Sequence, residues 1–286
     1  MNVRQRWPMA LASLAALSLP VIALSATDPV SDAVIAEQRQ TLQENTYGKG
    51  FGPQSPRNID QSAGNNAVVF TMAPPHNEMT LCNIHFHSGA EHAGGQFTDY
   101  AGNGDGQGYQ SGYLYTGTLS AQERAPVSES ICPGEHGQLQ AGDTIEIHYV
   151  HTTAEVAPGP TLGACLSDAA ANPQLRVEAQ VYVLVNDPHA LDFRQLTAIE
   201  QVGARYQSVN MPNWLGDPVE YAGSTTGPGY NEKGSPFQVS WRVYPKVARV
   251  NIGSVGQWCQ GNRFDEDHAH GVRNLVTNPA LLAPIP

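Results

Sequence analysis

The sequence carries little positive charge and few cysteines. Its 286 residues include 15 Lys and Arg against 26 Asp and Glu, which gives a net charge of −11. Binding to a phosphate backbone requires a basic surface, so this balance argues against nucleic acid as a partner. The cysteines are Cys82, Cys132, Cys165 and Cys259, and none forms a CxxC pair. A zinc site built on cysteine ligands is therefore not expected.

Long apolar runs are confined to the beginning of the chain. Arg4 and Arg6 precede the run MALASLAALSLPVIAL, and small residues follow up to Ala26. This order is typical of a secretory signal peptide, with an uncleaved membrane anchor as the alternative. We expect residues 1–26 to be the signal peptide and residues 27–286 to be exported, to the periplasm or outside the cell, without membrane contact. Four cysteines in an exported chain indicate disulfide bonds, but the sequence does not select among three pairings.

Glycine and proline punctuate short segments along the whole chain, and no repeat or linker divides it. Runs rich in Val, Ile, Tyr and Phe predict strands at 66–72, 80–87, 144–151, 176–185, 237–244 and 248–254. Helical patterns are few, and the best lie at 31–45 and 189–202. We therefore predict a single β-dominated α/β domain that is large enough for a sizeable core.

Two of the predicted strands carry histidines at alternate positions. Side chains two residues apart in a strand project from one face, so His85 and His87 can share an ion. If the two strands pair, His148 completes a three-histidine set, which leaves a fourth tetrahedral position for water, as in catalytic zinc sites. Histidine ligands usually donate their other N–H to an amide or carboxylate. Asn83 and Glu146 each lie two residues before a candidate ligand and are placed for this task.

A less specific interpretation stays open at this point. A His-x-His pair arises by chance fairly often in a chain with ten histidines. His151 is out of phase with His148 on the same predicted strand, so we expect it to face the other way and to be structural.

Five segments resemble motifs of the α-class carbonic anhydrases and occur in the same order. They are GPQSPRNID, NIHFHSGAEH, TIEIHYVHTT, YAGSTTGP and FQVSWRV. The α class normally has Trp after its His-x-His, where this chain has Ser88, and CNIHFHSGAEHAGGQF is more similar to the δ class. The chain thus resembles a δ-class carbonic anhydrase that shares the α-class active-site plan. The resemblance implies a large central, mostly antiparallel twisted sheet with a few short peripheral helices, in one catalytic domain over residues 27–286.

The resemblance also implies an activity and a cofactor. The activity is reversible hydration of carbon dioxide to bicarbonate and a proton by attack of zinc-bound hydroxide. His85, His87 and His148 would bind Zn²⁺, and cobalt or cadmium could occupy the same site. Asn83 and Glu146 would orient two of these ligands.

Further residues match the part of the family's site that handles the substrate. Thr226 stands where a threonine accepts a hydrogen bond from the hydroxide, and Glu91 matches the carboxylate that takes the threonine's proton. A one-residue gap would select Thr225 instead. The residues that match the apolar wall of the carbon dioxide pocket are Val150, Val239 and Trp241.

The resemblance fails at the proton shuttle. The position where many α-class enzymes have a shuttle histidine corresponds to Val68. His76 and His92 are the candidate replacements, with His136 and His189 as weaker ones. The histidines of the HAH segment, His268 and His270, could bind a metal, but we expect them only to lie on the surface.

Two other functions fit part of the sequence. A cupin-type metalloenzyme would use His85, His87 and Glu91 to bind iron or manganese. It would also need a later Pro-x-Gly-x-x-His segment, and it leaves GPQSPRNID and YAGSTTGP unexplained. A non-catalytic metal-binding relative is the second alternative, because no shuttle histidine is evident.

Overall fold

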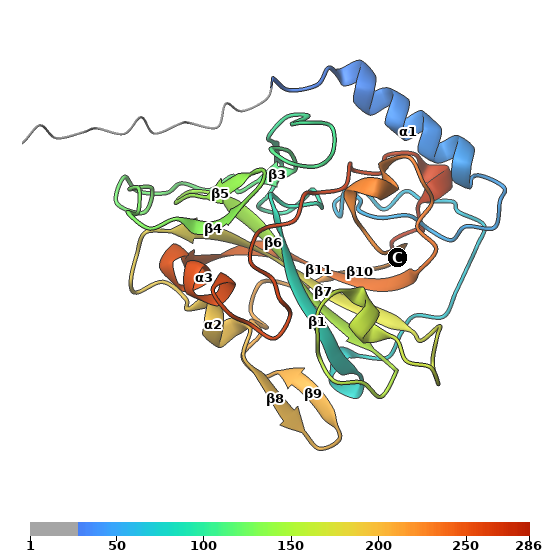
Figure 1. Cartoon of the computed structure of the whole chain (residues 1–286). Coiled ribbons are helices and arrows are strands. Elements are labelled where there is room, and N and C mark those ends of the chain that lie inside the picture. The colour runs from blue at the N-terminus through green and yellow to red at the C-terminus, as the bar shows by residue number, and fades with distance from the viewer. Residues whose placement is uncertain (1–27) are drawn as a thin grey trace, which may run out of the picture.

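The computed structural model describes residues 28–286 (Figure 1). The expected signal peptide, residues 1–26, lies outside the described residues. Within residues 28–286, none of the helices combines the length and the apolar character needed to cross a membrane.

A five-stranded sheet with the strand order β1-β6-β7-β11-β10 forms the centre of the protein (Figure 1). The bounds are Thr80–Ser88 for β1, Thr144–Thr152 for β6, Leu175–Val185 for β7, Gln238–Asn251 for β11 and Val219–Ser224 for β10. Strands β7 and β11 are parallel, and the other three pairs are antiparallel. The prediction of a β-dominated domain with a mostly antiparallel sheet is confirmed.

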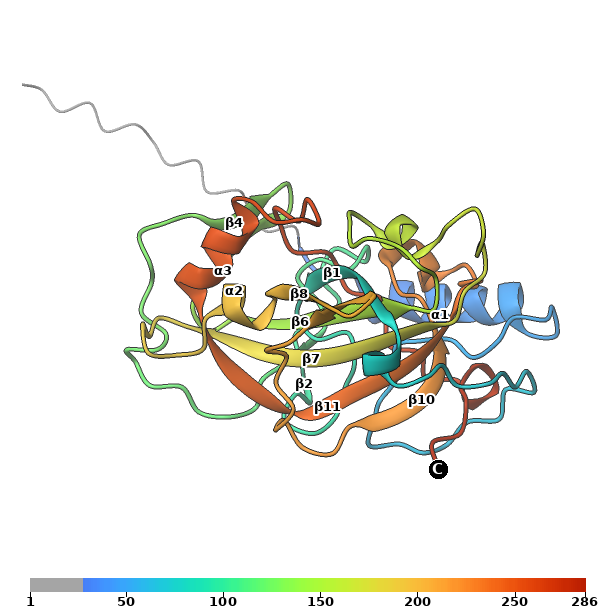
Figure 2. The same cartoon turned by 90° about the horizontal axis from the view of Figure 1, so that it is seen from below.

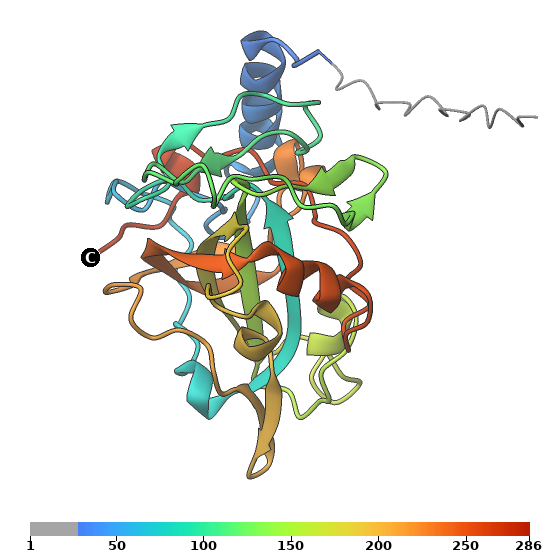
Figure 3. The same cartoon turned by 90° about the vertical axis from the view of Figure 1, so that its left-hand side faces the viewer.

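Three two-stranded ribbons surround this sheet. They are β2 (Asp99–Tyr100) with β3 (Tyr113–Leu114), β4 (Ile131–Gly134) with β5 (Gly137–Leu139), and β8 (Ile199–Val202) with β9 (Arg205–Ser208). The β8–β9 hairpin projects from the body of the protein (Figures 1 and 3).

Helices are short and lie around the sheet, as predicted. The α-helices are α1 (Asp32–Thr46), α2 (Phe193–Leu196) and α3 (Ile252–Cys259). The single 3₁₀ turns are η1 (His76–Glu78), η2 (Leu162–Cys165), η3 (Pro228–Asn231) and η4 (Pro279–Leu281). The predicted helix at 31–45 is confirmed by α1. Of the helix predicted at 189–202 only Phe193–Leu196 is helical, as α2. Residues 189–192 lie outside it, and residues 199–202 form strand β8, which pairs with β9.

Two further strand predictions were wrong in detail. Residues 66–72 form no strand, and Val69 in their middle is 89% exposed, so its side chain has no core to pack against. The segments 237–244 and 248–254 are not separate strands. They join as β11 up to Asn251, whose side chain then accepts from the Ser254 N–H and caps α3.

The two faces of the sheet differ in what they bury. On one face Phe86 and Tyr149 pack with Phe193 of α2 and Trp258 of α3 in the main apolar core. The two helices lie beside each other (Figure 2). Because alternate residues face opposite sides, Glu146, His148 and Val150 of β6 project from the other face. This second face carries the candidate site.

A β-bulge in β1 decides which face its histidines occupy. Leu81 pairs with His151, but Asn83 pairs with Val150, so the register shifts by one residue and Cys82 has no partner in β6. After the shift His85 lies opposite His148. Without the extra residue, the histidines of β1 would point into the apolar core, because a one-residue slip exchanges the faces.

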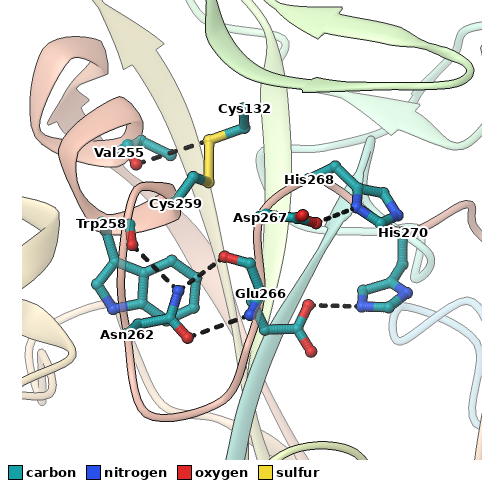
Figure 4. The surroundings of a disulfide bond; sticks show 9 residues. All are labelled: Cys132, Val255, Trp258, Cys259, Asn262, Glu266, Asp267, His268 and His270. Atoms are coloured by element: carbon teal, nitrogen blue, oxygen red, sulfur yellow. Dashed lines mark hydrogen bonds and ion pairs between the residues drawn. A yellow bond between two sulfur atoms is a disulfide. The ribbon is translucent and has the colours of Figure 1, made fainter.

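The structure selects one of the three cysteine pairings. Cys82 is bonded to Cys165, and Cys132 is bonded to Cys259 (Figure 4). All four cysteines are therefore in disulfides, as the even count indicated.

Candidate metal centre

Three histidines converge on the second face of the sheet, as the sequence predicted. The ring centroids of His85, His87 and His148 lie 4.7–5.3 Å apart. One nitrogen from each ring lies within 4.8 Å of the other two. The pairing of β1 with β6, in which His85 and His148 are direct partners, brings the rings together.

Each of these rings has one nitrogen committed to a hydrogen bond outside the cluster. His85 Nδ1 donates to Asn83 Oδ1 at 2.6 Å, and the Asn83 amide is itself oriented because its Nδ2 donates to the Gly159 carbonyl. His87 Nδ1 donates to the Gly271 carbonyl at 2.9 Å. The proton of each ring is thereby fixed on the nitrogen that faces away from the cluster.

His148 is held in the opposite sense. Its Nε2 donates to Glu146 Oε1 at 2.8 Å, so its Nδ1 carries the lone pair. That Nδ1 faces His85 Nε2 at 3.2 Å. Because His148 carries its proton on Nε2 and His85 carries its proton on Nδ1, no proton lies between these two facing nitrogens. Two nitrogens bound to one tetrahedral zinc ion lie about 3.3 Å apart.

The remaining nitrogen of the cluster also lacks a partner. His87 Nε2 is buried and makes no hydrogen bond. A buried acceptor without a partner is costly unless an ion or water satisfies it. Three converging lone pairs therefore fit a divalent metal ion, and the predicted roles of Asn83 and Glu146 as partners of two of these rings agree with their placement.

The protonation of the rings suits metal binding. Burial is the main reason that the pKa values of His85, His87 and His148 are all lowered, that of His87 to about 4. Neutral imidazoles are the form that binds metals.

Glu146 is the centre of a buried hydrogen-bond network. Besides His148, its carboxylate accepts from His92 Nδ1 at 2.7 Å and from the backbone N–H groups of Glu91 and His92. Burial alone would raise the pKa of Glu146, but the bonds from His92 and His148 hold it well below the usual range. The network continues through His92 Nε2, which lies 2.7 Å from the hydroxyl of Tyr221.

A second group, His92, Glu146 and His148, also has a spacing that a metal could bridge. Its facing atoms already form donor–acceptor pairs at 2.7 and 2.8 Å. These pairs need no ion, so His85, His87 and His148 form the better metal site.

Glu91 and Thr226 lie together at the edge of the cluster. Glu91 Oε1 accepts from the Arg273 N–H at 2.7 Å. Burial raises the pKa of Glu91, while His148, the Arg273 N–H and the nearby Thr226 hydroxyl act to lower it. Glu91 Oε2 has no hydrogen bond of regular geometry and is free for a further donor. Glu91 does not belong to either group of residues placed to share a metal, which removes the geometric basis of the cupin interpretation.

The structure favours Thr226 over Thr225 for the role predicted for a threonine. Both residues line the pocket, but the Thr225 hydroxyl is buried and hydrogen-bonded to the Ser235 hydroxyl.

An apolar cavity of about 210 Å³ opens directly above the histidines. The predicted residues Val150, Val239 and Trp241 all line it. Leu162, Leu175 and Val177 complete its apolar wall.

The predicted shuttle histidines do not reach this pocket. His76 lies beside Glu178 and His151 on the opposite face of the sheet. His92 is completely buried, and both its ring nitrogens are hydrogen-bonded. His151 faces away from the pocket, as expected, and donates through Nδ1 to the Tyr149 carbonyl.

Sequence reasoning missed His270. It lines the pocket, its side chain is 42% exposed, and its Nε2 bonds with Glu266 Oε2 at 2.6 Å (Figure 4). His270 therefore lies between the histidine cluster and solvent, where a proton relay would be needed. A backbone bridge to His87 brings it there across 183 residues of sequence. No local sequence pattern predicts a pairing between two such distant segments.

A sheet that presents three converging imidazoles beneath an apolar pocket defines a protein able to hold one metal ion beside a small apolar molecule. The family model described as delta carbonic anhydrase matches residues 76–254, which is more than half of the chain. The chain therefore belongs to the delta carbonic anhydrase family, as its motifs predicted, and carbonic anhydrases interconvert carbon dioxide and bicarbonate.

Comparison with other proteins adds distant similarities. No curated protein matches the chain. The α-carbonic anhydrase of Thermovibrio ammonificans, solved with sulfanilamide, is 15% identical with a TM-score of 0.30, over 88% of this chain and 96% of that one. The Photobacterium profundum α-carbonic anhydrase is 17% identical with a TM-score of 0.27, over 83% and 93%. Carbonic anhydrase Cah3 of Chlamydomonas reinhardtii, solved with acetazolamide, is 16% identical with a TM-score of 0.27, over 82% and 89%.

Proposed function

We propose that this protein hydrates carbon dioxide reversibly to bicarbonate and a proton at a zinc ion held by His85, His87 and His148. The observation that carries the proposal is the convergence of three ring nitrogens whose partner nitrogens all donate elsewhere. When bound, zinc lowers the pKa of a coordinated water to about 7 and so supplies hydroxide at neutral pH. Cobalt or cadmium could bind the same nitrogen ligands.

Asn83 and Glu146 keep the ligand set in its working state. Each accepts the N–H of a ligand ring and thereby holds that ring in one tautomer and one orientation. The four donors to Glu146 also keep it ionised, so that its negative charge supports the basicity of His148.

Thr226 and Glu91 would direct the attack on the substrate. In its ionised form Glu91 can only accept a hydrogen bond. If the Thr226 hydroxyl donates its proton to Glu91, its oxygen lone pairs would be left to accept a hydrogen bond from the hydroxide. A divalent cation nearby would favour this ionised form against the effect of burial. Thr226 would in this way aim the hydroxide at the carbon of the substrate.

The apolar wall suits carbon dioxide, which is small and has no net dipole. Val150, Val239 and Trp241 offer contact surface without hydrogen-bonding groups directed at the substrate. A substrate held only by apolar contacts and a charged product that returns readily to water would both leave such a pocket easily.

We also propose export of the protein. Two disulfides within the described residues support an oxidising compartment such as the periplasm or the extracellular space. The predicted signal peptide at 1–26 agrees with this location.

Stopped-flow measurement of carbon dioxide hydration, combined with zinc analysis, tests the proposal. We expect activity in the purified protein, its loss after treatment with a zinc chelator, and its return with one equivalent of zinc. His148→Ala should lose both zinc and activity. His151→Ala, on the same strand but on the other face, is the matched control and should retain both. Full activity in the chelated protein or in His148→Ala would refute the proposal.

A further inference from the structure

The disulfide between Cys82 and Cys165 joins the ligand strand to a loop at the pocket. Cys82 is the bulged residue of β1, next to Asn83 and three residues before His85. Cys165 ends η2, in the segment that connects β6 to β7. This yellow-green segment lies beside the start of β1 in Figures 1 and 3, in agreement with the contacts between β1 and η2.

The bulge determines where the ligands point. Leu81 and Ile84 both pack in the main core although they are three residues apart, an odd spacing that a regular strand would not allow. Cys82 therefore faces the pocket side together with Asn83. Loss of the bulge would exchange the faces and turn His85 into the apolar core.

The loop supports this bulge through its backbone. The Gly159 N–H donates to the Cys82 carbonyl at 3.0 Å, which replaces the partner that a bulged residue lacks. The Gly159 carbonyl accepts from Asn83 Nδ2 at 3.1 Å and so fixes the amide that holds His85. One loop residue thus fixes both the bulge and the orientation of a ligand partner.

Apart from this bridge and the bonds at Gly159, few contacts keep the loop in place, among them the bond from the Thr152 hydroxyl to the Cys165 carbonyl at 2.8 Å. Cys165 is its only buried residue between positions 159 and 174. Thr161, with a φ of 56°, adopts a left-handed conformation that is unfavourable for a residue other than glycine. A segment with so little buried surface opens readily unless a covalent bond holds it.

We propose that the Cys82–Cys165 disulfide positions the metal ligands, by locking the bulge in β1 and by docking the loop at Gly159 that orients Asn83. The inference rests on the proposed metal site. Its consequence is that the ligand set is complete only after oxidation, so that high metal affinity is tied to an oxidising compartment.

The second disulfide provides a matched control. Cys132–Cys259 joins β4 to the end of α3, close to the segment that carries Glu266 and His270 (Figure 4). It forms no hydrogen bond with any of the three candidate ligand histidines, and it closes a comparably long loop, with a sequence separation of 127 residues against 83. Removal of either bridge should therefore lower the overall stability by a similar amount.

The experiment compares Cys82→Ala/Cys165→Ala with Cys132→Ala/Cys259→Ala and the unchanged protein. Zinc affinity is measured by competition with a chromophoric chelator. We expect the first variant to bind zinc about 10–100-fold more weakly, the usual effect of disturbing the partners of metal ligands, and the second to stay within about twofold. In the second variant, reduction of the remaining bridge should weaken zinc binding to the same extent, and reoxidation should restore it.

Hydrogen exchange of the zinc-free proteins provides a readout that does not depend on the metal. Only loss of Cys82–Cys165 should accelerate exchange in both 80–87 and 159–165. Equal zinc affinity in the two variants, or unchanged exchange in these segments, would overturn the inference. Global unfolding of Cys82→Ala/Cys165→Ala at 10 °C would do so as well, because the bridge would then be a general support. If the unchanged protein itself binds no zinc, the proposed function fails, whereas the exchange result still decides the role of the bridge.

Discussion

Replacement of Glu146 by Gln tests the network that holds the ligands. Glu146 is fully buried and accepts four N–H groups, two on each carboxylate oxygen. Gln has one oxygen and one NH₂ group, so in either orientation two donors would face another donor. Each lost bond to a charged group is worth about 1.5–3 kcal/mol, which predicts a loss of about 3–6 kcal/mol in the free energy of unfolding.

The same change should weaken metal binding. When the Gln NH₂ group faces His148, that ring has no acceptor and is no longer held with the lone pair of Nδ1 toward the cluster. We therefore expect zinc affinity to fall about 10–100-fold. Glu178→Gln is the control, because Glu178 is also buried in the sheet but lies on the opposite face, where it accepts from the Tyr244 hydroxyl. Urea unfolding of the zinc-free proteins and chelator competition measure the two effects. The reasoning would be refuted if both variants lost stability but bound zinc equally well.

Three further predictions concern other parts of the structure. Thr226→Ala should lower kcat/KM about 100-fold with zinc content unchanged, whereas Thr225→Ala, whose hydroxyl is bonded to Ser235, should lower it less than tenfold in the same stopped-flow assay. Val239→Phe should reduce the 210 Å³ cavity and lower kcat/KM at least about tenfold without loss of zinc; unchanged kinetics would show that the substrate binds elsewhere. Burial, and then the neighbouring His76, lowers the pKa of His151 to about 3, so the unfolded chain takes up a proton below about pH 6.5 that the folded chain does not. This group should destabilise the fold progressively between pH 6.5 and 3, by about 2 kcal/mol at pH 5, and urea unfolding at pH 7.5 and 5 should show His151→Gln to be less acid-sensitive by that amount.

The sequence predicted well where a buried strand carries a regular pattern. Strands β6 and β7 are buried along their whole length, and their runs of β-branched and aromatic residues identify them without tertiary information. The prediction failed for residues 66–72, where the same residue types are exposed, and it missed β10, whose Gly223 and small neighbours resemble a loop. Strand propensity describes local preference, but burial and pairing decide the outcome.

In the candidate site, too, the residues that follow a local pattern were predicted and those that depend on tertiary contacts were not. His85, His87 and His148 could be grouped from their alternate spacing, because the bulge in β1 precedes Asn83 and leaves the phase of the later residues intact. His270 could not be found in this way, since only a bridge between distant segments brings it to the pocket. His76 was proposed from its nearness in sequence to the ligand strand, yet it lies on the opposite face of the sheet.

The most direct test of the account is the coordination of zinc in the purified protein, measured by X-ray absorption at the zinc edge together with the zinc content per chain. The account predicts one zinc ion per chain with three imidazole nitrogens at about 2.0–2.1 Å and one further light ligand. Two imidazoles with a carboxylate, or a scattering pattern that stays the same in His148→Ala, would contradict it.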